Sequence, residues 1–130
     1  MIDPVLLREN PDLIKRSQEA RGSSVEAVDA ALAADAERRA AISAFEALRA
    51  EQNLFGKKVA AAPKDEKKAL VAEAQTLAAQ VKAASAAATE AEERFTTIVR
   101  TIQNPIIDGV PAGGEDNFIT LRTHGDIPTF

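Results

Sequence analysis

Between residues 70 and 102 the apolar side chains recur at alternating steps of four and three, and no glycine or proline interrupts the stretch. A sustained 3.5-residue period is typical of a coiled coil, in which the apolar stripe of one helix packs against the stripe of another. A helix of this kind cannot bury its stripe alone, so the chain must supply a partner helix or bind one. The stripe consists of Leu70, Ala74, Leu77, Val81, Ala84, Ala88, Ala91, Phe95, Ile98 and Ile102.

A second stripe with the same period precedes the first and can serve as its partner. If the chain turns at residues 63–65, positions whose numbers add up to 129 face each other, and bulky residues meet small ones, as Phe45 meets Ala84. The sequence therefore predicts an all-α fold built on a long antiparallel two-helix hairpin. The helices are expected over about 24–61 and 66–103, with a tip at 62–65 and a length of about 55 Å. The second stripe consists of Ala27, Ala31, Ala34, Arg38, Ala41, Phe45, Leu48, Gln52, Phe55 and Val59.

Local signals mark the ends of the hairpin. Ser23 and Glu26 have the spacing of a capping box, and Gly22 stands just before them as a helix stop. The pair Asn104-Pro105 predicts the end of the second helix, because the residue before a proline avoids the α conformation. The hairpin is therefore expected to occupy residues 23–103.

The two flanking segments have different characters. In residues 1–22, Asp3-Pro4 and Asn10-Pro11 each combine an N-cap with a proline at the first helical position, which predicts two short helices packed at the root of the hairpin. Residues 104–130 are expected to form a linker that contains a strand over 118–123. A single strand is not stable alone, so we expect it to join a sheet in sequence beyond Phe130.

Composition excludes several classes of protein. The chain has no cysteine, which removes disulfides and cysteine metal sites and fits a reducing, cytoplasmic compartment. Its first residues are not expected to act as a signal peptide, because an acid and a proline stand where a basic region would be, and no apolar run approaches the roughly 20 residues of a membrane span. Aromatic residues make up only 4% of the chain, which favours a thin, alanine-rich helical protein over a compact globular core.

No catalytic, cofactor-binding or metal-binding residues emerge from the sequence. His124 is the one histidine, it has no cysteine or second histidine to share a metal, and it is interpreted as a loop residue. The glycines at 109, 113 and 114 lack the lysine and hydroxyl residue of a phosphate-binding loop. Glu92-Glu93 are neighbours on a solvated helix and not facing acids in a pocket. The chain is therefore not expected to be an enzyme by itself.

Charge is sorted along the hairpin, although the whole chain is acidic with a net charge of -4. Residues 49–82, the half nearer the tip, contain seven basic and four acidic residues, whereas the half nearer the root contains four basic and eight acidic residues. A basic tip with an acidic root would confine a polyanion to the far end, through contacts to phosphate and sugar. The alternative is a solvated helix surface with a chance asymmetry. The predicted RNA-binding residues are Arg49, Lys57, Lys58, Lys64, Lys67, Lys68 and Lys82.

Several short strings resemble the N-terminal region of bacterial seryl-tRNA synthetases. The similarity runs over all 130 residues and is most specific at its two ends. Gln103 stands where the family usually has proline, and Gly56 stands where it usually has serine. The strings are residues 1–3 (Met-Ile-Asp), 6–11 (Leu-Leu-Arg-Glu-Asn-Pro), 35–39 (Asp-Ala-Glu-Arg-Arg), 50–53 (Ala-Glu-Gln-Asn), 102–104 (Ile-Gln-Asn) and 110–117 (Val-Pro-Ala-Gly-Gly-Glu-Asp-Asn).

The resemblance implies a helical arm that leans out from a class II catalytic core and grips the long variable arm and the elbow of serine tRNA. It implies that the core, with its ATP and Mg²⁺, follows residue 130, and that the parent protein is a homodimeric serine-tRNA ligase. The chain itself would then bind tRNA without charging it, use no cofactor and contact neither DNA nor a membrane. Because its apolar stripe is satisfied internally, we also expect the chain to be a monomer. The alternative function is a structural spacer or a protein-interaction hairpin that binds no RNA. Salt-sensitive binding to tRNA separates the two functions.

Overall fold

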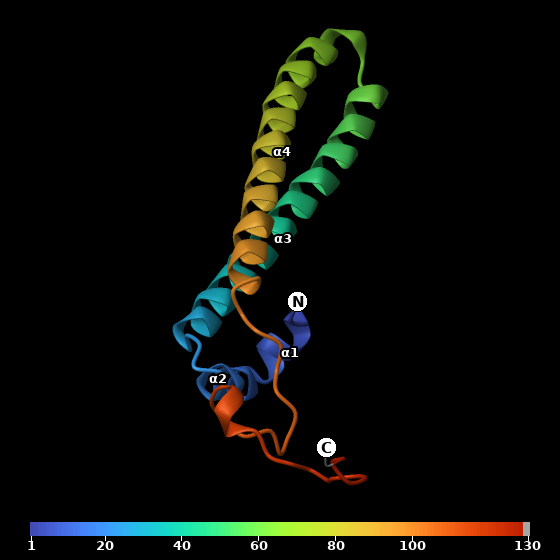
Figure 1. The fold of residues 1–130 in the computed structure, drawn as a ribbon. Coiled ribbons are helices and arrows are strands. Elements are labelled where there is room, and N and C mark those ends of the chain that lie inside the picture. Colours follow the sequence, from blue (N-terminus) through green and yellow to red (C-terminus); the bar gives the residue numbers. More distant parts are fainter. Residues whose placement is uncertain (129–130) are drawn as a thin grey trace.

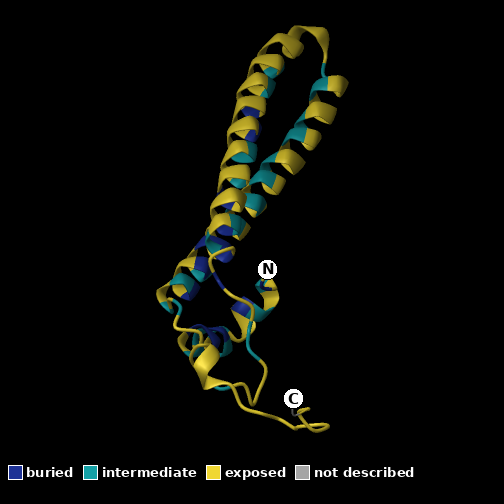
Figure 2. Ribbon diagram, viewed as in Figure 1, coloured by how far each residue is buried: buried dark blue, intermediate teal, exposed yellow. Residues whose placement is uncertain are grey.

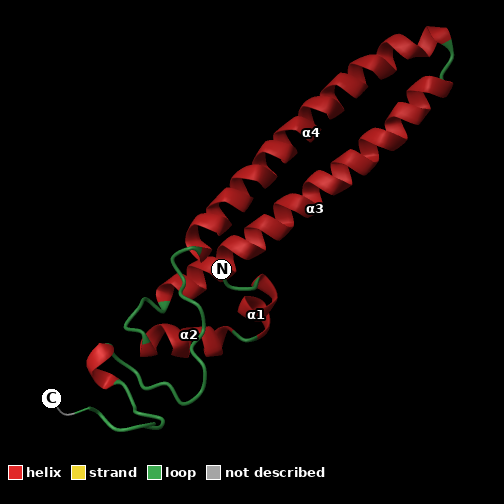
Figure 3. Cartoon of the chain, turned by 45° about the vertical axis from the view of Figure 1, so that its right-hand side comes forward, coloured by secondary structure: helices red, strands yellow, loops and turns green. Residues whose placement is uncertain are grey.

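The computed structural model describes residues 1–128, and it is a long helical hairpin that stands on two short helices (Figure 1). Residues 129 and 130, the last two of the predicted linker, lie outside the described residues. Between residues 100 and 128 the chain passes back beside the short helices as loops and one 3₁₀ turn (Figure 3). The elements are α1 (Pro4–Glu9), α2 (Pro11–Ala20), α3 (Glu26–Ala61), α4 (Lys64–Val99) and the 3₁₀ turn η1 (Glu115–Asn117).

The predicted antiparallel hairpin is confirmed. All residues of both predicted stripes are buried or half-buried, whereas most of the helical residues between them are exposed, so the buried side of each helix faces the other (Figure 2). Two ion pairs join the helices near the root, from Arg38 to Glu92 at 3.3 Å and from Arg94 to Glu37 at 3.5 Å. The residue numbers of the two pairs add up to 130 and 131, close to the predicted sum of 129. The heptad pattern therefore predicts the partner helix, its direction and its alignment.

The second helix of the hairpin is displaced from its predicted bounds. α4 begins at Lys64, directly after Pro63, and it ends at Val99 instead of 103. The chain leaves the helix through a tight turn in which the hydroxyl of Thr101 donates to the carbonyl oxygen of Ile98 at 2.6 Å. Ile102 lies beyond the helix and still is only 5% exposed, because the turn carries its side chain back into the core.

The predicted capping box at Ser23 is wrong. α3 begins at Glu26 without any side-chain cap, because Ser23 is already used to close the preceding helix. The backbone N–H of Ser23 donates to the carbonyl of Gln18 at 2.8 Å, and that of Gly22 donates to Glu19 at 3.0 Å. Gly22 has a φ of 70°, and the two bonds are those of a Schellman motif, so its predicted role as a helix stop is confirmed.

The two predicted N-terminal caps are confirmed. The carboxylate of Asp3 accepts from the backbone N–H of Val5 at 2.9 Å, and the side-chain oxygen of Asn10 accepts from that of Leu13 at 3.3 Å. A proline occupies the first position of each helix, where the missing N–H has no cost. Two consecutive cap-and-proline signals therefore produce the two short helices.

The strand predicted over 118–123 is wrong for this structure. Residues 1–128 contain no strand, and Phe118, Ile119 and Leu121 are 76%, 60% and 92% exposed. A lone strand leaves its backbone groups unpaired, and the described residues offer no second strand to pair with it. The loop that precedes this segment is tied to α2, because the N–H of Gly113 donates to the carbonyl of Ala20 at 3.1 Å.

The main hydrophobic core lies at the root of the hairpin and not along its length. α1 and α2 contribute Leu7 and Ile14 to a cluster with the first turns of α3 and the last turns of α4. Both side chains are less than 2% exposed. The arm therefore rises from a compact base, and its distal part is held only by the stripe. The other buried members of the cluster are Ile2, Val28, Ala31, Ala34, Phe95, Val99 and Ile102.

Candidate nucleic-acid interface

The seven predicted RNA-binding residues are all exposed, and they occupy the distal part of the hairpin. Five of them surround the turn between α3 and α4, on the last turns of one helix and the first turns of the other. Arg49 and Lys82 lie farther from the turn, by about 18 Å and about 27 Å along their helices. The fold thus brings the five lysines together at the tip and places Arg49 and Lys82 along the shaft. The tip residues are Lys57, Lys58, Lys64, Lys67 and Lys68.

The ion pairs of the structure are concentrated at the root. Within residues 1–128, none of the seven distal cations has a carboxylate oxygen within 4.0 Å. Root cations differ, because four of them are engaged by acidic side chains. The distal cations therefore remain available to a ligand, whereas half of the eight root cations are already paired. The ion pairs are Arg8–Asp35, Lys15–Asp29, Arg38–Asp35, Arg38–Glu92, Arg94–Glu37 and Arg94–Glu90.

Two of the distal cations lie over half-buried aromatic rings of the stripe. The guanidinium carbon of Arg49 is 5.9 Å from the centre of the Phe45 ring, and the Nζ of Lys58 is 5.7 Å from the centre of the Phe55 ring. In this arrangement an apolar stem covers the stripe while the charged head stays in water. Because both rings serve the seam, they are not free to stack on bases.

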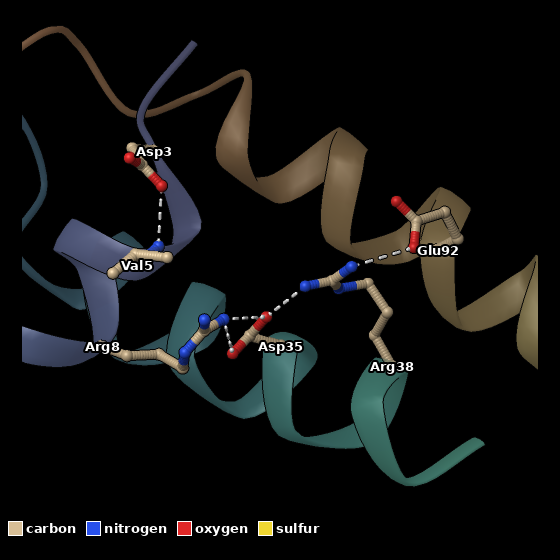
Figure 4. Close-up of polar contacts among 6 residues, drawn as sticks. All are labelled: Asp3, Val5, Arg8, Asp35, Arg38 and Glu92. Atoms are coloured by element: carbon tan, nitrogen blue, oxygen red, sulfur yellow. Dashed lines mark hydrogen bonds and ion pairs between the residues drawn. The ribbon is translucent and has the colours of Figure 1, made fainter. Parts of the chain in front are cut away.

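A charged network at the root holds α1, α3 and α4 together, and it was not anticipated from the sequence. The side chain of Asp35 is only 2% exposed, and it accepts hydrogen bonds from Arg38 at 2.7 Å and from Arg8 at 3.1 Å (Figure 4). Arg38 also reaches Glu92 on α4, and its guanidinium lies 4.6 Å from the centre of the Phe95 ring. A signal for this network was present, since a charged residue at stripe position 38 requires a partner.

The network also changes the acidity of its buried member. Burial by itself raises the pKa of Asp35, but the hydrogen bonds from Arg38 and Arg8, helped by their positive charges, outweigh burial and hold that pKa below its ordinary value of 3.8. The same contacts raise the pKa of Arg38, chiefly through its hydrogen bond to Asp35. Asp35 is therefore ionised at neutral pH and serves as a structural anion at the root.

A second buried polar group ties the linker to the base. The side chain of Gln18 is 1% exposed, donates to the carbonyl of Ser24 at 3.1 Å and accepts from the N–H of Gln103 at 3.1 Å. Ser17 adds a hydrogen bond from the N–H of Ile106 to its hydroxyl at 3.0 Å. These bonds join α2 to the chain on both sides of the hairpin, and nothing in the sequence pattern distinguishes Gln18 from a surface glutamine.

The remaining features of the described chain concern metal ligands, helix character and surface hollows. Residues 1–128 contain no group of three or more His, Cys, Asp or Glu side chains that could hold a metal ion, and none of their helices combines the length and apolar character that a membrane crossing needs. His124 is exposed in the C-terminal loop. A hollow of about 450 Å³ among residues 107–121 is lined mainly by apolar side chains and loop backbone, at the opposite end of the molecule from the tip cations.

Comparisons with known proteins identify the family to which the chain belongs. The family described as Seryl-tRNA synthetase N-terminal domain matches residues 1–106. The chain is 63% identical to a serine–tRNA ligase of Leifsonia xyli and 55% identical to that of Clavibacter michiganensis, over all 130 residues in each case. It is 55% identical to the serine–tRNA ligase of Mycolicibacterium smegmatis over 126 residues. The chain spans about 30% of the length of these relatives. It therefore belongs to the seryl-tRNA synthetase N-terminal domain family.

Proposed function

We propose that the chain is a tRNA-binding arm, whose distal hairpin grips the long variable arm and the elbow of serine tRNA. The observation that carries the proposal is the set of seven exposed distal cations, which have no acidic partner within residues 1–128 and lie at the far end of a long arm. Such cations bind the phosphate backbone of a nucleic acid and release its counterions.

The kind of nucleic acid follows from what the arm lacks. The rings of Phe45 and Phe55 are committed to the seam, so the distal arm has little aromatic surface for stacking on single-stranded bases. Phosphate and sugar contacts without stacking suit a double-stranded RNA stem, which proteins recognise mainly by its shape and backbone. The variable stem of serine tRNA is such an element, and the arm then reads its presence and direction and leaves the anticodon unread.

Catalysis is assigned to sequence that this chain does not contain. The relatives are named serine–tRNA ligases, and the chain covers less than a third of their length. We propose that the remaining part of such a protein forms the class II core that binds ATP and Mg²⁺ and charges the tRNA in a cytoplasmic homodimer. The chain by itself is then a monomer that binds serine tRNA with a Kd of about 10⁻⁴–10⁻⁶ M and does not aminoacylate it.

Charge reversal at the tip tests the proposal. Binding of a serine tRNA transcript is measured by fluorescence anisotropy at several salt concentrations. The variant that changes Lys57, Lys58, Lys64, Lys67 and Lys68 to glutamate is expected to lose most of the affinity and most of its salt dependence. The matched control changes the same five lysines to arginine, and it is expected to bind within a few-fold of the original chain because arginine keeps the charge.

The opposite result supports the alternative function. If the unaltered chain shows no salt-sensitive binding to the transcript, the hairpin acts as a spacer or a protein-interaction element, and the tRNA proposal is wrong. If the glutamate variant binds as tightly as the original chain, RNA is bound elsewhere and the tip is not the site.

A further inference from the structure

The two broad sides of the hairpin differ in charge, and the helix positions beside the stripe reveal the difference. With the stripe at heptad positions a and d, positions e and b lie on one side of each helix, and positions g and c lie on the other. In an antiparallel pair the e and b sides of both helices form one flank. The structure agrees, because Glu37 and Arg94, both at g, form an ion pair, while Val28 and Val99, both at e, share the root core.

The distal charges divide unequally between these flanks. Over residues 49–82, the e and b positions carry four cations and no acid, and we call this side the basic flank. The g and c positions carry three acids and one cation, and we call this side the acidic flank. The other distal charges (Lys57, Asp65 and Lys67) lie at f or a positions between the flanks. The basic flank consists of Arg49, Lys64, Lys68 and Lys82, and the acidic flank of Glu51, Glu66, Glu73 and Lys58.

We infer that the RNA stem lies against the basic flank, and this inference rests on the proposed function. A helix with its side chains is about 10–12 Å thick, which exceeds the screening length of about 8 Å at physiological salt. The charges of the acidic flank therefore do not cancel the attraction of the basic flank for phosphates close to it. A stem on the acidic flank would instead meet three carboxylates.

The spacing of the cations suits an extended polyanion. Lys68 and Lys82 lie two heptads apart on the same face of α4, which separates their backbones by about 21 Å. Arg49 lies on the same flank of the neighbouring helix, so the cations form a surface two helices wide. A small anion would contact only one of these side chains, whereas an RNA backbone passes several in succession.

The root of the same flank carries the short helices. Arg8 of α1 reaches Asp35, which is at an e position, and Leu7 and Ile14 share a core with Val28 and Val99 (Figure 4). α1 and α2 therefore bound the basic flank at its lower end. A stem bound on this flank therefore lies on the same side of the hairpin as α1 and α2.

Neutralisation on one flank, with a matched charge change on the other, tests the inference. The test variant combines Arg49→Gln, Lys68→Gln and Lys82→Gln. The control combines Thr76→Glu, Gln80→Glu and Ala83→Glu. These three residues are exposed on the acidic flank, and the substitutions change the net charge by the same amount as the test variant does. Binding of a serine tRNA transcript to the full 130-residue chain is measured between about 50 and 200 mM salt, and circular dichroism checks that both variants keep the helical content.

The basic-flank variant is expected to bind about tenfold more weakly, with a salt slope smaller by about 2–3, because up to three phosphate contacts are lost. The control is expected to change affinity by less than about threefold. An equal loss in both variants, or a loss in the control alone, overturns the flank assignment and leaves the proposed function standing. Failure of the unaltered chain to bind the transcript overturns both proposals.

Discussion

Nη2 of Arg38 lies 2.7 Å from Oδ1 of Asp35, at the point where the arm meets its base. Asp35 is almost fully buried, and the same carboxylate receives Arg8 from α1. The other terminal nitrogen of Arg38, Nη1, donates to Oε2 of Glu92 on α4 at 3.3 Å. Asp35 therefore joins the N-terminal helix to α3 directly and to α4 through Arg38, and two predictions about stability depend on it.

Removing the buried anion should destabilise the chain strongly. Asp35→Ala leaves Arg38 without its nearest partner in a largely buried site, and the expected loss in the free energy of unfolding is about 3 kcal/mol. Urea unfolding followed by circular dichroism measures the loss. The control is Asp29→Ala, which breaks the exposed pair with Lys15 and should change stability far less. Similar losses in the two variants would show that the root network does not stabilise the fold.

The same network should make stability depend on pH in acid. The pKa of Asp35 is lowered in the folded state, so the unfolded chain binds more protons near and below pH 3.8, and stability rises with pH there. The contribution is fully present above pH 3.8 and is lost as the pH falls through the lower, folded-state pKa. The difference in unfolding free energy between the original chain and Asp35→Asn should therefore be constant near neutral pH and shrink toward pH 2. A difference that stays constant down to about pH 2 would contradict the assignment.

Gln18 should control the junction between α4 and the linker. Gln18→Ala removes the acceptor for the N–H of Gln103 and the donor for Ser24, at a cost of about 1–3 kcal/mol. The amide of Gln103 should also exchange its hydrogen faster, which NMR measures directly. Gln80→Ala, at an exposed position of α4, is the control and should change neither quantity. Unchanged exchange at Gln103 in the Gln18 variant would refute the proposed tie.

Two glycine-to-alanine substitutions should act in opposite directions. Gly22 has a positive φ, so Gly22→Ala should destabilise the chain by about 1 kcal/mol. Gly56 lies within α3, and a methyl group added there would meet no atom within 4 Å, so Gly56→Ala should stabilise the chain by about 0.4–1 kcal/mol. Thermal unfolding of the two variants measures both effects. Changes of the same sign would contradict the backbone assignments at these residues.

Periodicity was sufficient to predict the hairpin, because two stripes of matching period leave an antiparallel pair as a self-contained solution. It was insufficient where tertiary contacts decide the local structure. α3 begins without the capping box because Ser23 closes the Schellman motif of α2. α4 ends before residue 103 because Thr101 forms a turn and the N–H of Gln103 donates to the side chain of Gln18. The predicted strand at 118–123 has no partner among the described residues, so its alternation alone could not produce it.

The candidate site was predictable in composition but not in arrangement. Counting charges along the hairpin finds the cations of the tip, since helix spacing fixes how far each lies from the turn. The count could not show that Arg38 and Arg94 are paired at the root while Lys68 and Lys82 have no acidic partner in the described chain, because pairing depends on side chains brought together by the packing of two helices. The buried state of Asp35 depends in addition on α1, which no heptad pattern includes.

The most direct test of tRNA recognition by the arm is a comparison of two RNAs that differ only in the variable stem. The affinity of the 130-residue chain is measured at one fixed low salt concentration for a serine tRNA transcript and for the same transcript with its long variable stem replaced by a short loop. We predict clearly tighter binding of the transcript that carries the stem, because the distal cations contact its backbone. Equal affinity for the two transcripts would contradict the claim that the arm recognises this stem.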